Sequence, residues 1–190
     1  MPHCQSQDYI TRLASRDPQA EILFYYAGHG LPDEQTKEPY LIPVDVNATS
    51  LSSAIALYDM YKKLSATNAS KITVFLDACF SGGGRDMGLL ASRGVRVTPK
   101  KTELTGNIVV FSATSENQTA LPYWDKKHGM FTYFLLKKLQ DSKGACSYSE
   151  LSDYLTRQVG ENSLRENRKD QTPEVNTSRQ VSDEWGEWKF

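Results

Sequence analysis

The sequence predicts an α/β domain in which helices flank a mainly parallel central sheet. Three apolar runs of about six residues are too short for helices and are typical of buried strands: Glu21–Ala27, Lys71–Leu76 and Asn107–Ser112. Segments with helical apolar spacing follow the first and the third run. Strands that alternate with helices favour parallel pairing in a layered domain, and 190 residues are enough for one domain with a single core.

Two helices and a loop are predicted around the first strand. We expect a short helix over residues 8–15, and a loop over residues 31–49, where three prolines occur among several Asp and Asn residues. Ser52 or Ser53 is predicted to cap the next helix, which ends near Asn68. The apolar residues of that helix recur at roughly helical spacing: Ile55, Leu57, Met60, Tyr61 and Leu64.

The second half of the chain predicts two further helices and a polar tail. Residues 85–103 are polar and irregular, whereas Met130–Leu139 and Tyr148–Val159 are amphipathic, and Ser147 begins a capping-box pattern for the latter helix. Beyond residue 160 the chain is polar, and Trp185 and Trp188 are expected to hold this tail against the domain. We therefore predict one domain over residues 1–190, with a core at about 20–160 and a polar C-terminal segment at 161–190.

Composition excludes several classes of protein. The net charge is −1, with 24% charged and 39% hydrophobic residues, so neither a nucleic-acid partner nor a polybasic membrane patch is expected. No apolar run approaches the roughly 18 residues of a membrane helix, and the first 20 residues lack the apolar centre of a signal peptide. The cysteines Cys4, Cys79 and Cys146 are odd in number and widely spaced, which argues against a disulfide framework or paired zinc ligands. A reducing, cytoplasmic location is the expectation.

A histidine and a cysteine follow two of the predicted strands at their carboxyl ends. His29 lies between Gly28 and Gly30 after the first strand, and Cys79 comes shortly after the second, 50 positions later. Parallel sheets bind ligands beyond the carboxyl ends of their strands, so the two side chains can converge there with residues 112–116.

This pair has the chemistry of a nucleophile and its base. A free thiol has a pKa of about 8.5 and is mostly protonated at pH 7, so a catalytic cysteine needs a base such as histidine. That histidine can then return the proton to a leaving amine. The N–H groups of Gly30 and Cys79 are natural oxyanion donors, because glycine lets a substrate carbonyl approach the backbone. A turn histidine and a buried structural cysteine are the alternatives, but their matched positions favour catalysis.

Two segments around these residues resemble the signature motifs of caspase-like cysteine peptidases. They are Tyr25–Gly30, "YYAGHG", and Leu76–Gly83, "LDACFSGG", and the caspase histidine also lies about 50 residues before its cysteine. Three more segments resemble the prokaryotic, metacaspase-like (orthocaspase-type) branch: "YLIPVD" at 40–45, "VFSAT" at 110–114 and "HGMFTYFLLKKL" at 128–139. The resemblance implies a three-layer caspase-like (caspase-hemoglobinase) fold and a thiol protease in which Cys79 is the nucleophile, His29 the base and acid, and Gly30 an oxyanion donor.

The resemblance also bears on substrate specificity. Caspases hold a P1 aspartate with Gln-Ala-Cys and a later arginine, whereas this chain has Asp77-Ala78-Cys79 and neither Arg nor Lys at 112–124. Asp77 resembles the metacaspase acid that binds P1 Arg or Lys, with Glu116 as a second acidic candidate and Ala27 as a further substrate-binding residue. The alternatives are a strand-end carboxylate satisfied by nearby N–H groups for Asp77, and a solvated loop side chain for Glu116. We predict cleavage of proteins or peptides after Arg or Lys.

The sequence also bears on activation and on cofactors. Self-cleavage is expected at Arg85, Arg93, Arg96 or Lys100, which lie in the polar stretch after the cysteine. No cofactor or metal is predicted. Some metacaspases depend on calcium, but the acidic residues of this chain do not form a calcium loop of recognisable spacing.

The chain departs from the family pattern at its beginning. The caspase-like fold starts with a strand, a helix and another strand before the histidine strand, but only about 20 residues precede Ile22 here. We therefore expect an N-terminally truncated sheet with an exposed edge, which another polypeptide could complete. The alternative to an active endopeptidase is a catalytically inactive caspase-like module for binding or regulation, or a truncated remnant.

Overall fold

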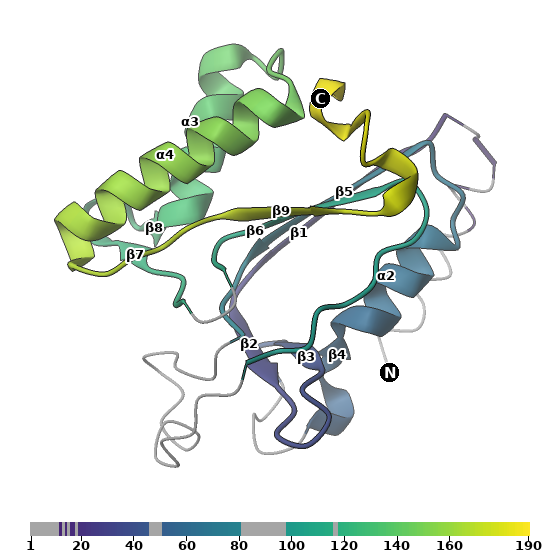
Figure 1. Ribbon diagram of the computed structural model, residues 1–190, viewed down its shortest axis with the longest axis horizontal. Helices are drawn as coiled ribbons and strands as arrows, with labels where there is room; N and C mark the ends of the chain where they lie inside the picture. The colour runs from purple at the N-terminus through teal and green to yellow at the C-terminus, as the bar shows by residue number, and fades with distance from the viewer. Residues whose placement is uncertain are drawn as a thin grey trace.

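The computed structural model describes residues 12, 14, 16–17, 19–45, 51–80, 98–115 and 118–190. A four-stranded sheet in the order β1-β5-β6-β9 forms its centre, and helices cover both faces (Figure 1). The strands are β1 (Glu21–Ala27), β5 (Lys71–Asp77), β6 (Ile108–Ser112) and β9 (Glu174–Thr177). β1, β5 and β6 run parallel, and β9 is antiparallel to β6. The mainly parallel α/β sheet is thus confirmed.

The three predicted strands are confirmed, but the first differs from the others in burial. β5 and β6 are almost wholly buried, because they are central strands covered on both faces. β1 forms an edge of the sheet in the described part of the chain, and Leu23 and Tyr25 on it are 58% and 44% exposed. The expectation of a mostly buried first strand is therefore wrong, whereas the expected exposed edge is present. Pairing of this edge with another chain stays a prediction.

Helix α2 (Leu57–Ser65) covers one face of the sheet. Its buried residues pack with the β5 and β6 side chains that point to this face: Leu57, Met60, Tyr61 and Leu64 against Ile72, Val74, Leu76, Ile108 and Val110. The helix starts later than predicted, because Leu51–Ser53 form a 3-10 turn, η1, and Ile55–Ala56 form a short strand, β4. Its N-cap is Ala56 rather than Ser52 or Ser53.

Helices α3 (Met130–Ser142) and α4 (Tyr148–Asn167) cover the other face (Figure 1). The side chains of Phe75 and Phe111 point to this face and pack against Phe131, Leu151 and other buried residues of the two helices. The predicted capping box is confirmed, since the Ser147 side chain accepts from the Glu150 backbone and Glu150 bonds back to the Ser147 backbone.

The chain beyond residue 160 belongs to the layered structure. α4 continues to Asn167, and β9 then joins the main sheet as its antiparallel edge. Two 3-10 turns follow, η4 (Arg179–Val181) and η5 (Trp185–Glu187). Trp185 contacts Phe111 and Trp188 contacts Tyr148, both edge to face, so the two tryptophans hold the tail as expected.

Short antiparallel strands occupy residues 31–32 and 39–42 of the predicted loop over residues 31–49. β2 (His29–Pro32) pairs with β3 (Pro39–Ile42), which pairs with β4. Pro32 and Pro39 face one another at the loop end of the β2–β3 hairpin, so prolines mark strand ends here rather than the absence of strands. A second small hairpin joins β7 (Pro122–Tyr123) to β8 (His128–Gly129) through the 3-10 turn η3 (Trp124–Lys126).

Candidate active site

The register of the central sheet brings the histidine and cysteine segments to one edge. β1 and β5 pair in parallel with Ala27 opposite Asp77, so His29 and Cys79 both lie two residues beyond this pair. The Gly28 N–H donates to the Asp77 carbonyl at 3.1 Å, which extends the pairing past the end of β1. The carboxyl ends of these neighbouring parallel strands thus place the two candidate catalytic residues on adjacent segments of the chain.

Gly30 lies against the backbone of the candidate nucleophile. A Cβ built on Gly30 would lie 2.7 Å from the carbonyl oxygen of Cys79 and 2.5 Å from the ring of Phe80. Real Cβ contacts essentially never fall below 3.0 Å, so β2 can pass this close to residues 79–80 only with glycine at position 30. Gly30 is itself buried at this point.

Cys79 is a buried thiol with two backbone donors. Its relative exposure is 8%, and this burial raises the pKa of the Cys79 thiol. The N–H groups of Ala120 and of Cys79 itself bond to the sulfur and lower its pKa in part, while the nearby Asp77 carboxylate raises it. Because hydrogen bonds to a thiolate favour the charged form, these two donors work in the direction that a nucleophile requires.

His29 is exposed, and Tyr26 fixes the backbone beside it. The Tyr26 hydroxyl donates to the carbonyl oxygens of His29 at 2.8 Å and Ile42 at 2.9 Å. A Cβ on Gly28 would lie 2.7 Å from the same hydroxyl, so glycine leaves room for it. Tyr26 therefore joins the turn that carries the histidine to β3.

Asp77 is buried on the α3 side of the sheet. Its Oδ2 accepts from the Thr132 backbone N–H at 3.1 Å and from the Thr132 hydroxyl at 2.5 Å, near the N-terminus of α3. Thr132 Oγ1 in turn accepts from the Tyr25 hydroxyl at 2.7 Å. Burial raises the pKa of the Asp77 carboxyl, and the two bonds from Thr132 lower it in part. Gly129 is tightly packed against the carboxylate, where a side chain would collide with it.

The other predicted substrate-binding residues have different placements. Ala27 is exposed at the end of β1, opposite Asp77. Glu116 lies outside the described residues, as do Arg85, Arg93 and Arg96. Lys100 is exposed, and its backbone N–H donates to the Lys37 carbonyl at 2.7 Å.

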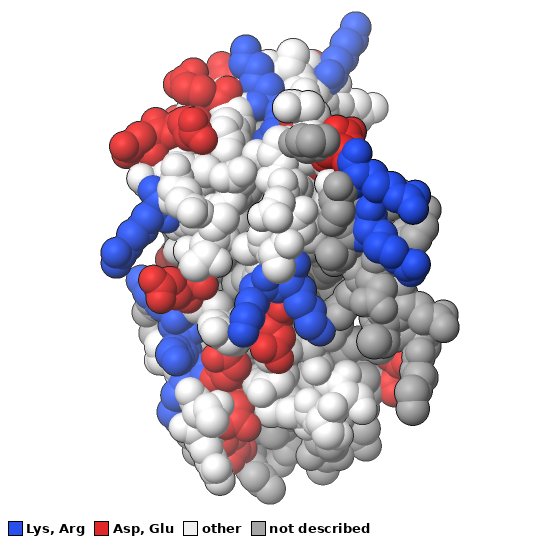
Figure 2. Space-filling model, turned by 90° about the vertical axis from the view of Figure 1, so that its right-hand side faces the viewer, with Lys and Arg blue, Asp and Glu red and all other residues white. Residues whose placement is uncertain are grey.

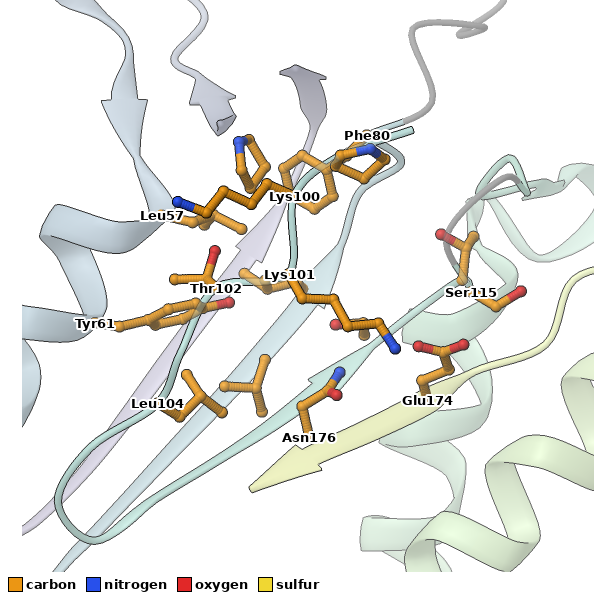
Figure 3. Close-up of a pocket in the computed structure, with 16 residues that line it drawn as sticks. Leu57, Tyr61, Phe80, Lys100, Lys101, Thr102, Leu104, Ser115, Glu174 and Asn176 are labelled. Carbon is orange, nitrogen blue, oxygen red and sulfur yellow. The ribbon is translucent and has the colours of Figure 1, made fainter. Parts of the chain in front are cut away.

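A cavity of about 120 Å³ lies on the α2 side of the sheet, between β5, β6 and residues 99–104. Leu76, Phe80 and Ser112 line it at the strand ends, and Lys101 and Glu174 project toward one another at its rim (Figure 3). Asp77 points to the opposite face, so the acidic candidate and this cavity lie on different sides of β5.

Surface charge and metal-ligand geometry add little to the site. On the face shown in Figure 2, acidic and basic side chains are interspersed. Within the described ranges, His, Cys, Asp and Glu residues do not gather in groups of three or more that could hold a metal ion. The helices described here are each too short or too polar to cross a membrane.

Several residues at this edge were not predicted from the sequence. Tyr26, Ala120 and Thr132 contact the candidate residues, yet each is distant in sequence from at least one of the groups it contacts. Only the alternation of Tyr25 and Tyr26 on a predicted strand could have indicated that one tyrosine faces each side.

Comparison with known proteins identifies related folds. A family model described as "Caspase domain" matches residues 5–183. Among solved structures, protein GSU0716 from Geobacter sulfurreducens is similar with a TM-score of 0.60 and 19% identity, over 92% of this chain and 72% of that one. Caspase-1 from Spodoptera frugiperda is similar with a TM-score of 0.59 and 13% identity, over 93% of this chain and 68% of that one. No curated protein matches the chain. At these identities, the structural likeness shows the shared caspase-like fold.

Proposed function

Because the chain belongs to the caspase domain family, which implies cysteine peptidase activity, we propose that it is an endopeptidase in which Cys79 and His29 form the catalytic dyad. The observation that supports this most is the register of β1 and β5, which places both residues two positions beyond a paired strand end. The metacaspase-like motifs around them support the same assignment.

In the proposed reaction, His29 takes the proton of the Cys79 thiol as the sulfur attacks the scissile carbonyl carbon. The tetrahedral intermediate collapses, the C–N bond breaks, and His29 gives the proton to the leaving amine. Water, activated by His29, then hydrolyses the thioester and releases the acid. Burial raises the pKa of the thiol, so a base is needed at neutral pH, and the exposed imidazole can supply it. This mechanism uses no cofactor.

We assign the oxyanion donors to the N–H groups of Gly30 and Cys79. The close approach of Gly30 to the Cys79 carbonyl puts these two stretches of backbone in contact. Two converging N–H groups can stabilise the developing oxyanion, and preorganised donors of this kind contribute about 2.7–4 kcal/mol each.

Asp77 is proposed as the residue that selects Arg or Lys at P1, with Ala27 and Glu116 as further contacts. Its carboxyl is buried two residues before Cys79, and its negative charge raises the pKa of the Cys79 thiol. A substrate guanidinium or ammonium would compensate a carboxylate that burial otherwise disfavours. Its bonds to Thr132 also stabilise the start of α3, so the residue has a structural contact that the proposed role must accommodate.

Self-cleavage is proposed within the polar segment that follows Cys79. Arg85, Arg93, Arg96 and Lys100 are the candidate P1 residues. Lys100 has its backbone N–H bonded to Lys37, so cleavage after Lys100 requires that contact to open.

The burial of Cys79 favours a second candidate function, that of a non-catalytic caspase-like module. A thiol that is 8% exposed, with its pKa raised by burial, is less reactive than an exposed one. In that case the active edge, the end of the sheet that carries His29 and Cys79, would serve binding rather than hydrolysis.

Hydrolysis of fluorogenic peptides separates these proposals. Matched peptides that differ only in Arg, Lys or Asp at P1 are incubated with the wild-type chain and with Cys79→Ala and His29→Ala. We expect cleavage after Arg and Lys that both substitutions abolish. Preference for Asp would contradict the P1 assignment, and activity that survives Cys79→Ala would contradict the dyad. A folded but inactive wild-type chain would favour the binding module.

A further inference from the structure

Gln171 is a fully buried amide that ties together the two ends of the loop after β6. Its Nε2 donates to the Ala113 carbonyl at 3.0 Å, and its Oε1 accepts from the Leu121 N–H at 2.9 Å. The relative exposure of Gln171 is 0%. Burying an amide costs free energy unless its polar atoms are bonded, so these two bonds define where the loop ends must lie.

The side chain is anchored to a rigid element. The Gln171 backbone N–H donates to the Ser163 hydroxyl at 3.1 Å, and that hydroxyl donates to the Gly160 carbonyl at 3.0 Å within α4. Ser163 is also fully buried. Ala113 and Leu121, the two ends of the loop, are therefore fixed to the last turns of a 20-residue helix.

The fixed end of this loop contacts Cys79. Ala120, whose N–H bonds to the Cys79 sulfur, directly precedes Leu121. Leu121 is held on both sides of its own backbone, because its N–H donates to Gln171 and its carbonyl accepts from Met130 at 2.9 Å. A shift of Leu121 would carry Ala120 with it and turn the N–H away from the sulfur.

We propose that Gln171 is a positioning residue for Cys79, which holds the loop so that the Ala120 N–H stays directed at the sulfur. The inference rests on the proposed function, in which Cys79 is the nucleophile. A hydrogen bond to the thiolate stabilises the charged form of the group. Losing that bond should therefore raise the pKa of the thiol by about 1 unit, the lower end of what a bond to a charged group contributes.

The test uses Gln171→Met, which keeps a similar side-chain volume and removes both bonds. Gln118→Ala is the matched control, since Gln118 also bonds this loop to the neighbouring residue Thr172, but at an exposed position. The rate of alkylation of Cys79 by iodoacetamide is measured against pH, and the site is resolved by peptide mass spectrometry, with labelling of the buried Cys146 as a report of unfolding. We expect the Cys79 pKa to rise by about 1 unit in Gln171→Met and by less than about 0.3 unit in Gln118→Ala.

An unchanged Cys79 pKa in folded Gln171→Met would overturn the inference, as would an equal rise in Gln118→Ala. If Gln171→Met does not fold, Ser163→Ala removes the acceptor of the Gln171 backbone N–H and the bond to the Gly160 carbonyl, and it keeps both side-chain atoms of Gln171. A smaller rise in the Cys79 pKa is then expected, and no rise would overturn the inference. Alkylation does not depend on peptide hydrolysis. A wild-type chain that cleaves no peptide would thus refute the proposed function alone, whereas an active chain with an unmoved pKa would refute the role of Gln171 alone.

Discussion

Replacing Gly30 by alanine places a methyl group where the active edge has no room for it. The new Cβ would lie 2.7 Å from the Cys79 carbonyl oxygen, about 0.7 Å closer than the 3.4 Å at which ordinary contact begins, and 2.5 Å from the Phe80 ring. The ring can rotate, but the carbonyl belongs to the backbone of the candidate nucleophile. Either β2 or residues 79–80 must therefore move by most of an ångström.

A displacement of this size at the reacting groups should be costly for catalysis. Misplacement by about 1 Å can lower a rate about 100-fold, and loss of one oxyanion donor costs about 100- to 1000-fold in kcat. We therefore expect kcat/KM for an Arg-P1 peptide to fall at least about 100-fold in Gly30→Ala, mainly through kcat. Initial rates with a fluorogenic peptide measure this.

Gly160→Ala is the matched control, because none of the described atoms outside its own helix lies within 4 Å of the new methyl group. Gly160 lies inside α4, so alanine should leave the kinetics unchanged and stabilise the fold by up to about 1 kcal/mol. A folded Gly30→Ala chain with kcat/KM within about threefold of wild type would refute the inference that Gly30 lines the reacting edge.

Two further substitutions test the groups around the dyad. Burial raises the pKa of Asp77, so the folded chain holds the proton of this carboxyl more tightly than the unfolded chain does. The resulting contribution to the free energy of unfolding is fully present below the ordinary carboxyl pKa of 3.8, and it is lost as pH rises through the pKa of the folded state. Asp77→Asn should remove that loss, which makes the variant more stable than wild type at neutral pH by about 1.4 kcal/mol for each unit of pKa shift, and should abolish the preference for Arg or Lys at P1. Urea unfolding between pH 4 and 8 and a P1 peptide panel measure both effects, and a variant that is less stable at pH 7 would count against this reasoning. Tyr26→Phe removes the hydroxyl that is bonded to the His29 and Ile42 carbonyls. We expect a loss of about 1–2 kcal/mol in stability and a lower kcat with little change in KM. A loss of stability with unchanged kcat would show that Tyr26 does not position the histidine.

Much of the fold follows from local sequence patterns, because buried strands and amphipathic helices have strong periodic signals. The apolar runs of β5 and β6 and the capping box of α4 are examples. The β2–β3 hairpin did not follow, since strands of four residues with prolines at their ends lack such a signal. Nor could the sequence show that β1 is exposed, because burial depends on which strand lies beside it.

The candidate site was likewise only partly predictable from the sequence. The matched positions of His29 and Cys79 follow from the strand ends that precede them, so spacing and parallel pairing were enough to place them on one edge. The groups that surround them come from distant segments. Thr132 bonds Asp77 across 55 positions and Gln171 bonds Leu121 across 50. Such contacts depend on how α3 and α4 pack on the sheet, which periodicity does not encode.

Covalent labelling of Cys79 by a peptide acyloxymethyl ketone with Arg at P1 tests the proposed chemistry most directly. We expect mass spectrometry to find the peptide on Cys79, with no labelling of Cys79→Ala, much slower labelling of His29→Ala, and little labelling by the same probe with Asp at P1. A folded chain in which Cys79 remains unlabelled, while denaturation exposes it to simple alkylation, would contradict the catalytic assignment and support a non-catalytic module.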